Sequence, residues 1–117
     1  MGKVILDTSF ILTCIKQKID FFEQLELEGF EFLIPKQVFA ELKGLSKSKP
    51  NAKLALKIIE KNNFKEMDLN TKNTDEGIIK FARKNPEIYI ATIDARIKTR
   101  TRNRKIFIRG KKRLEIA

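Results

Sequence analysis

Short apolar runs alternate with amphipathic helical segments along most of the chain. Apolar runs predict strands over 3–7, 30–35, 87–94 and 105–110, and a half-polar run predicts a further short strand over 64–69. The intervening periodicity predicts helices over 9–17, 20–29, 36–45, 52–62, 73–85 and 95–103, and residues 111–117 are expected to form a tail. Alternation of this kind predicts right-handed crossovers and a three-layer α/β/α sandwich around a mainly parallel sheet of about five strands.

Local signals support these boundaries. Gly29 is expected to end a helix, Pro35 to close a strand, and Pro86 to lie just beyond a helix that Asn73 or Thr74 caps. The helix over 52–62 is expected to turn four apolar residues inward, namely Leu54, Ala55, Ile58 and Ile59. Neither a repeat nor a linker interrupts the pattern, so residues 1–117 are expected to form one domain.

The composition excludes several kinds of structural and catalytic site. The 117 residues include no histidine and one cysteine, Cys14, which excludes disulfide frameworks, Cys/His zinc sites and Ser-His-Asp triads. An enzyme built from this sequence must therefore rely on carboxylates and a hard, oxygen-ligated metal. Apolar runs are too short to cross a bilayer and the start does not resemble a signal peptide, so a cytoplasmic location without a membrane partner is expected.

Positive charge is concentrated in the C-terminal segment. The net charge is +10, yet residues 95–117 contain ten Lys and Arg against a single acid, Glu115. Either this segment is a solvated, solubilising surface, or it binds a polyphosphate such as a nucleic acid. The candidate RNA-binding residues are Arg96, Lys98, Arg100, Arg102, Arg104, Lys111, Lys112 and Arg113.

Four acidic residues occupy positions where a core would favour apolar side chains. Asp7 and Asp94 end strands, Glu41 lies on the apolar face of its helix, and Asp75 shares a helix face with inward-pointing residues. Each has a structural explanation when taken alone, such as capping the next helix or a favourable place in a first helical turn.

Taken together, the four acids predict a metal site. Ligands of open α/β sheets bind at the carboxyl ends of the strands, and these positions can converge there. Close carboxylates repel one another unless a cation such as Mg²⁺ or Mn²⁺ neutralises them. A basic segment beside such a site suits a nucleic-acid phosphodiester, whose backbone it would position while the metal activates water.

The chain resembles the PIN-domain nucleases over essentially its whole length. The matching stretches are "VILDTSFIL", "IPKQVFAELKGL", "NTDEGIIKFARK", "IYIATIDARIK" and "KIFIRGKKRLEI". The resemblance maps the family's four acids onto Asp7, Glu41, Asp75 and Asp94, and its hydroxyls onto Thr8 or Ser9 and Thr92. Ile93 departs from the pattern, because Asn is common there, and Glu76 is either an auxiliary acid or a solvated helix start.

The resemblance implies Mg²⁺- or Mn²⁺-dependent hydrolysis of single-stranded or looped RNA, leaving a 5′-phosphate. It implies that Asp7 and Asp94 hold the main metal, that Glu41 and Asp75 serve as further ligands or position water, and that no side chain acts as nucleophile. Within the family, the chain looks most like archaeal relatives of the ribosomal-RNA-processing nucleases. A VapC-type toxin with an antitoxin partner is the alternative.

Other classes fit less well. A catalytically idle RNA-binding PIN module would not need four intact acids. A receiver domain needs adjacent acids near the first strand, and a haloacid dehalogenase phosphatase needs a second Asp where Ser9 stands. Dimers are common among PIN domains, so a second copy of the chain is an expected partner, although the sequence identifies no interface.

Overall fold

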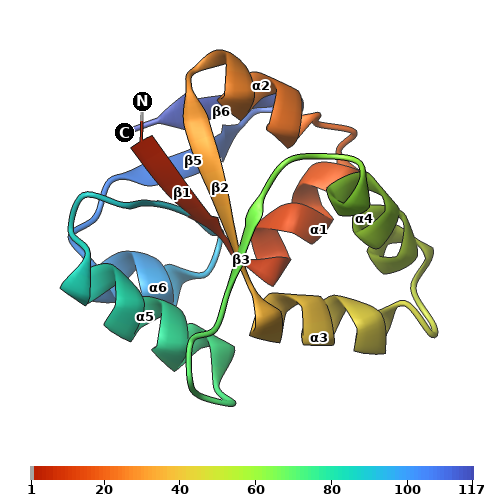
Figure 1. Ribbon diagram of the computed structural model, residues 1–117. Coiled ribbons are helices and arrows are strands. Elements are labelled where there is room, and N and C mark those ends of the chain that lie inside the picture. The colour runs from red at the N-terminus through yellow and green to blue at the C-terminus, as the bar shows by residue number, and fades with distance from the viewer. Residues whose placement is uncertain (1) are drawn as a thin grey trace.

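The computed structural model describes residues 2–117, which form one sheet covered by helices (Figure 1). The six strands are β1 (Gly2–Leu6), β2 (Phe30–Pro35), β3 (Lys65–Met67), β4 (Tyr89–Ala91), β5 (Lys105–Arg109) and β6 (Arg113–Ile116). Their order in the sheet is β3-β2-β1-β4-β5-β6, and every pair except β5–β6 is parallel. Strand β1 therefore lies inside the sheet, between β2 and β4.

Six helices form the two outer layers. They are α1 (Thr8–Lys16), α2 (Phe21–Leu27), α3 (Lys36–Leu45), α4 (Pro50–Glu60), α5 (Thr74–Lys84) and α6 (Ala95–Arg100). Figure 1 shows α5 and α6 on one side of the sheet and α1, α3 and α4 on the other. The predicted three-layer arrangement around a mainly parallel sheet is therefore confirmed.

Side-chain alternation along β1 divides the core between the two faces. Val4 and Leu6 pack in the larger cluster with residues of α1 to α4, whereas Ile5 packs in the smaller cluster with residues of α5 and α6. All three are fully buried, as expected for a central parallel strand covered on both faces. This packing fixes the carboxyl end of β1, where Asp7 follows.

The prediction that residues 111–117 form a tail was wrong. Residues 113–116 form a sixth strand, β6, antiparallel to β5 through pairs such as Ile106 with Ile116. Gly110 makes the turn between them at φ +64, a conformation that glycine adopts without strain. Leu114 and Ile116 pack against the larger core. This largely polar segment therefore forms an edge strand of the sheet.

The orientation of α4 also differs from the prediction. Its buried residues are Ala52, Ala55 and Ile59, and Ile58 is partly buried. Leu54 points outward with 48% of its surface exposed. The helix turns its small residues inward because α4 packs closely on α1 and α3, which leaves the larger Leu54 outside. Within residues 2–117, no helix is both long and apolar enough to span a membrane.

Candidate active site

Asp7 lies at the carboxyl end of β1, where backbone and side-chain contacts hold it in place. Its backbone N–H donates to the Ala91 carbonyl at 3.0 Å, which continues the β1–β4 pairing. Its Oδ1 accepts the Thr8 backbone N–H at 2.9 Å, and its Oδ2 accepts the Ser9 hydroxyl at 3.0 Å. Asp7 is only 4% exposed, and burial raises the pKa of its carboxyl despite these hydrogen bonds.

Thr92 links the acids at the ends of β1 and β4. Its hydroxyl donates to Asp7 Oδ2 at 2.8 Å and accepts the Asp94 backbone N–H at 3.0 Å. Thr92 is completely buried, and its bond to Asp7 is shielded from water. The prediction that Thr92 supports the acids is consistent with this double contact.

Asp94 caps the start of α6. Its Oδ1 accepts the backbone N–H groups of Arg96 at 2.8 Å and Ile97 at 3.3 Å, which leaves Oδ2 for other contacts. The structural reading of Asp94 as a helix cap is therefore correct, and the cap also fixes the direction of the carboxylate.

Glu41 reaches the same region from α3. Its Oε1 accepts a short hydrogen bond from the hydroxyl of Thr8, so Thr8 contacts Glu41 with its side chain and Asp7 with its backbone. Electrostatic repulsion from Glu41 contributes to the raised pKa of Asp7. The Glu41 residue as a whole is exposed, not packed in the core.

Asp75, in the first turn of α5, completes the group. Partial burial and the negative charges of Asp94 and Asp7 raise the pKa of its carboxyl, while the nearby positive charge of Arg96 opposes that rise. The proximity of the Asp94 carboxyl group to that of Asp75 acts in the same direction as the burial. These acids, which come from distant parts of the chain, therefore interact electrostatically.

All four acids line one open cleft of about 520 Å³. The lining also includes Leu12, Gly44 and Leu45, which the sequence did not suggest as site residues. The spacing of three and four residues from Glu41 could have indicated Gly44 and Leu45, because residues at that spacing share a helix face. Within residues 2–117, no three Asp, Glu or Cys side chains lie close enough together to form a metal site as they stand.

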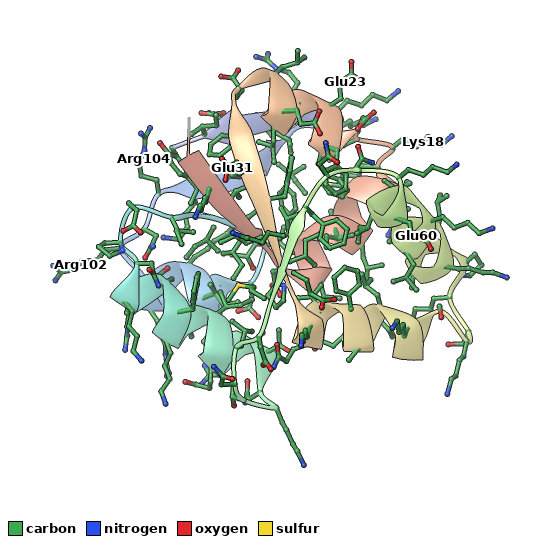
Figure 2. The ribbon with its side chains drawn as sticks, in the orientation of Figure 1. Lys18, Glu23, Glu31, Glu60, Arg102 and Arg104 are labelled. Carbon is green, nitrogen blue, oxygen red and sulfur yellow. The ribbon has the colours of Figure 1, made fainter. Side chains whose placement is uncertain are left out.

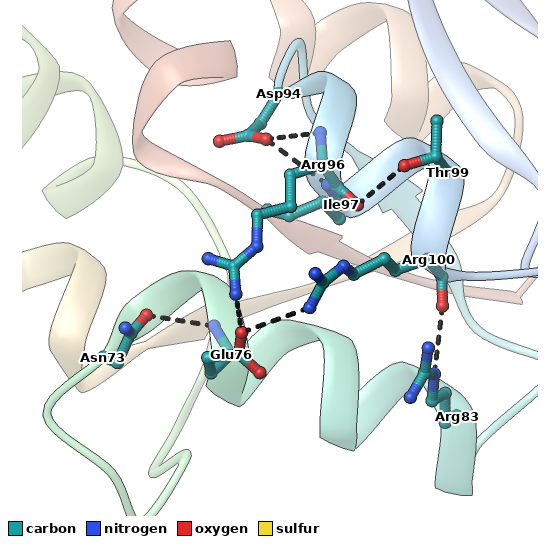
Figure 3. Close-up of polar contacts among 8 residues, drawn as sticks. All are labelled: Asn73, Glu76, Arg83, Asp94, Arg96, Ile97, Thr99 and Arg100. Carbon is teal, nitrogen blue, oxygen red and sulfur yellow. Dashed lines mark hydrogen bonds and ion pairs between the residues drawn. The ribbon is translucent and has the colours of Figure 1, made fainter.

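Glu76 does not line this cleft and points toward Arg96 and Arg100 of α6 (Figure 3). Its carboxylate forms a short ion pair with Arg96 and a second ion pair of 3.6 Å with Arg100. The residue therefore joins α5 to α6 through ion pairs that the sequence analysis did not predict.

The eight candidate RNA-binding residues do not all have free side chains. Arg96 and Arg100 pair with Glu76, and the Lys98 ammonium lies 5.2 Å from the centre of the Phe107 ring. Arg104 donates to the Tyr89 hydroxyl at 2.8 Å, beside the start of β4 and away from the acids at its end. The remaining four are exposed and lie in the loop after α6 and in the β5–β6 hairpin: Arg102, Lys111, Lys112 and Arg113.

Two further features lie outside the acidic cleft. A larger groove of about 770 Å³ is lined mainly by residues of α2 and α4, including the exposed Leu27 and Leu54. Cys14 is fully buried, and burial raises the pKa of its thiol to about 12. Its thiol is therefore unsuited to nucleophilic chemistry.

Comparison with known proteins agrees with this arrangement. A family model described as a PIN like domain matches residues 4–111. The chain is 32% identical to Ribonuclease VapC4 from Methanocaldococcus jannaschii, over 99% of this chain and 97% of that protein.

Solved structures give the same result at the level of the fold. The PIN domain endonuclease Utp24 matches with a TM-score of 0.83 and 28% identity, covering 97% of this chain and 90% of that one. VapBC2 from Rickettsia felis, solved with a DNA fragment from its promoter, matches with a TM-score of 0.62 and 22% identity, covering 86% of this chain and 94% of that one. Together with the match over residues 4–111, these likenesses show that the chain belongs to the PIN-domain family.

Proposed function

We propose that the chain is a Mg²⁺- or Mn²⁺-dependent endoribonuclease that hydrolyses RNA phosphodiester bonds in the cleft lined by Asp7, Glu41, Asp75 and Asp94. The observation that carries the proposal is the convergence of these four acids from β1, α3, α5 and the start of α6. Close carboxylates repel one another, so a cluster of them does not stabilise the fold. A divalent cation such as Mg²⁺ or Mn²⁺ is bound by several oxygen atoms of this kind.

The oxygen atoms present suit such a cation. Asp7 Oδ1 accepts a single hydrogen bond, and Asp94 uses Oδ1 for both of its cap bonds, so each has an oxygen with room for a ligand. Asp7 and Asp94 would hold the cation, with Asp75 and Glu41 moving closer by side-chain rotation. When bound, the cation supplies positive charge that polarises the phosphodiester and lowers the pKa of water.

The surrounding hydroxyls have positioning roles in this proposal. Thr92 and Ser9 hold Asp7 Oδ2, which fixes the orientation of the carboxylate and leaves Oδ1 with a single hydrogen bond from the Thr8 backbone N–H. Thr8 holds Glu41 at the cleft, where its carboxylate can accept a proton from attacking water. No side chain is required as a nucleophile.

Asp7→Asn tests the proposal directly. The substitution keeps the shape of the side chain and removes its charge, so we expect it to abolish Mn²⁺-dependent RNA cleavage while leaving the fold and RNA binding largely intact. Cleavage of a panel of structured RNAs, with circular dichroism and an RNA-binding assay on the same preparations, measures all three properties. Glu60→Gln, which removes an exposed acid at the end of α4, is the matched control and should cleave normally.

Cleavage by Asp7→Asn at the rate of the unmodified protein would contradict the proposed site. Loss of cleavage in both Asp7→Asn and the control would instead indicate a general effect of charge. Omission of the divalent cation, or its removal with a chelator, should abolish cleavage by the unmodified protein.

We further propose that the substrate is a ribosomal RNA precursor. The resemblance of the sequence to archaeal relatives of the rRNA-processing nucleases supports this role, as does the 28% identity to the endonuclease Utp24 over almost the whole chain. Cleavage at one site of a precursor RNA, without growth arrest when the protein is produced in a bacterial host, is the expected result.

A toxin is the second candidate function, favoured by the 32% identity to Ribonuclease VapC4. A toxin would arrest growth on production, and an antitoxin encoded by the directly preceding reading frame would relieve that arrest. The two roles share the acidic cleft and differ in substrate and partner, so growth measurements separate them.

A further inference from the structure

A second, basic recess lies on the side of the molecule formed by α5 and α6. It has a volume of about 440 Å³, and its lining consists of Ala82, Arg83, Pro86, Thr99, Arg100, Thr101, Arg102 and Asn103. Three of these eight residues are arginines and none is acidic. Arg102 projects away from the molecule (Figure 2), so the recess is open to solvent.

The positive charge around this recess is only partly neutralised. Arg100 pairs with Glu76 at 3.6 Å, but no ion pair among residues 2–117 includes Arg83 or Arg102. Like charges that lie close together without counter-charges lower the stability of the folded protein, and an anion bound in the recess would offset that loss.

Protein donors already occupy the backbone carbonyls near the recess. The side-chain amide of Asn103 donates to the carbonyls of Ala82, Asn85 and Ile88 at 2.9 to 3.0 Å. Arg83 Nε donates to the Arg100 carbonyl at 3.0 Å, which leaves the terminal nitrogens of that guanidinium free. Several of the carbonyls that would repel an anion at the C-terminal ends of α5 and α6 are therefore engaged.

A buried cation adds to the positive charge beneath the recess. The ammonium of Lys105 donates to the carbonyls of Thr101 and Asn103, both of which line the recess. Burial lowers the pKa of the Lys105 ammonium. Its hydrogen-bond acceptors are carbonyl oxygens, and none of the ion pairs within residues 2–117 includes it.

The recess and the acidic cleft lie at opposite ends of the same helix pair. Asp75 is in the first turn of α5 and Arg83 in its last, a separation of about 12 Å at the helical rise of 1.5 Å per residue. Figure 3 shows Arg96, Arg100 and Arg83 following one another between α5 and α6, starting beside Asp94. The arginines therefore lie along a line from the cleft to the recess, over a distance that a few nucleotides of RNA would span.

We propose that this recess binds a backbone phosphate of the RNA strand whose scissile bond lies in the acidic cleft. Arg83 and Arg102 contact the phosphate, and Arg96 and Arg100 line the path between the two sites. Phosphate fits better than a carboxylate, because three guanidiniums around one recess match the several oxygens of a phosphate. The proposal rests on the proposed function in that the bound strand is the substrate.

Salt-dependent RNA binding tests the recess separately from catalysis. The double variant Arg83→Gln/Arg102→Gln is compared with its parent, both carrying Asp7→Asn, on single-stranded RNA oligonucleotides of increasing length. On long oligonucleotides we expect weaker binding at low salt, and a plot of log K against log salt that is less steep by about 0.7 for each phosphate that the variant no longer binds. Oligonucleotides too short to extend beyond the cleft should bind both proteins equally.

Two matched variants control for charge and for folding. Lys53→Gln/Lys57→Gln removes the same charge from exposed positions of α4, in the opposite helical layer, and should leave the slope unchanged. Arg83→Lys/Arg102→Lys keeps the charge and should retain the slope even if thermal unfolding shows a lower Tm.

The proposal is overturned if the α5–α6 and α4 double variants change the slope equally, or if the weakening of binding does not depend on RNA length. It is also overturned if RNA binding is unchanged while binding of polyglutamate is abolished, which would assign the recess to an acidic polypeptide. Residual cleavage by Asp7→Asn would contradict the proposed active site without altering these binding measurements.

Discussion

At the scale of single residues, Asp7 combines burial with three hydrogen bonds. Burial outweighs the bonds from Thr92, Ser9 and the Thr8 backbone, so its pKa is raised in the folded protein. A folded-state pKa above the unfolded value means that the folded protein binds the proton more tightly. The contribution of Asp7 to stability is then greatest at acidic pH and is lost as the pH rises through the folded-state pKa.

Asp7→Asn should therefore be at least as stable as the unmodified protein at neutral pH without divalent cations. Because the amide does not ionise, the advantage of the variant in free energy of unfolding should grow as the pH rises above about 4, the usual pKa of an aspartate, toward the raised pKa of folded Asp7. Urea unfolding at a series of pH values measures it. A difference that does not change with pH would show that the charge of Asp7 is not destabilising.

Thr92 connects two acids through one hydroxyl, which makes that hydroxyl sensitive to substitution. Thr92→Val keeps the side-chain shape but leaves the partly buried Asp94 N–H without its acceptor and removes one of the two donors to Asp7 Oδ2. We expect a decrease of about 1–3 kcal/mol in the free energy of unfolding, measured by urea unfolding. Thr92→Ser restores the hydroxyl and should recover most of that decrease; equal destabilisation by both variants would contradict the role of the hydroxyl.

Sequence reasoning located the acidic residues but not every neighbour. Asp7 and Asp94 could be placed at one sheet edge because both follow predicted strands, and the structure brings them together with Glu41 and Asp75. The pairing of Glu76 with Arg96 could not be predicted, because it depends on how α5 lies against α6. Spacing within a single helix carries no information about that contact.

At the scale of elements, the glycines of α5 and α3 have opposite surroundings. A Cβ on Gly77 would lie 2.7 Å from Thr71 Cγ2 and 2.8 Å from Leu69 Cβ, whereas a Cβ on Gly44 would meet nothing within 4 Å. Helix α5 therefore packs directly on the segment that precedes it, and Gly77 permits that approach.

The two glycines give a matched pair of substitutions. Gly77→Ala should lower the free energy of unfolding by about 1–3 kcal/mol through overpacking. Gly44→Ala should raise it by about 0.5–1 kcal/mol, because alanine favours the helix and has space. Thermal or urea unfolding measures both, and a stabilising Gly77→Ala would contradict the close packing of α5.

Strand β6 illustrates why one element was missed. "RLEI" alternates apolar and polar residues, which is a strand signal, but the preceding "GKK" and the high charge favoured a tail. In the structure Leu114 and Ile116 face the core, while Arg113 and Glu115 are exposed. Alternation over four residues is a weak signal, and pairing with β5 decides the outcome.

At the scale of the whole molecule, the proposed cation would connect the sheet to both helical layers. A ligand that binds only the folded state at 100 times its Kd adds about 2.7 kcal/mol to the free energy of unfolding. We expect Mn²⁺ to stabilise the unmodified protein and Glu60→Gln equally, and to have no such effect on Asp7→Asn or Asp94→Asn. Thermal unfolding with and without Mn²⁺ measures this, and equal stabilisation of all four proteins would place the ion elsewhere.

The overall architecture was largely predictable, whereas the surface was not. Alternating strands and helices require crossovers, so the three layers follow from the order of elements. The basic recess did not follow, because Arg83 lies outside the charged segment 95–117 and joins Arg100 and Arg102 only through packing of α5 on α6. Counting charges along the sequence therefore left Arg83 out of this surface.

The order of the acids along the chain has a consequence for biosynthesis. Asp7 is translated before its hydrogen-bond donor Thr92 and its neighbour Asp94, which follow more than eighty residues later. The carboxyl end of β1 also remains without β4 until residues 89–91 have left the ribosome. The proposed active site is therefore incomplete while the chain is being made beside ribosomal RNA, so the order of translation would delay the proposed cleavage of RNA.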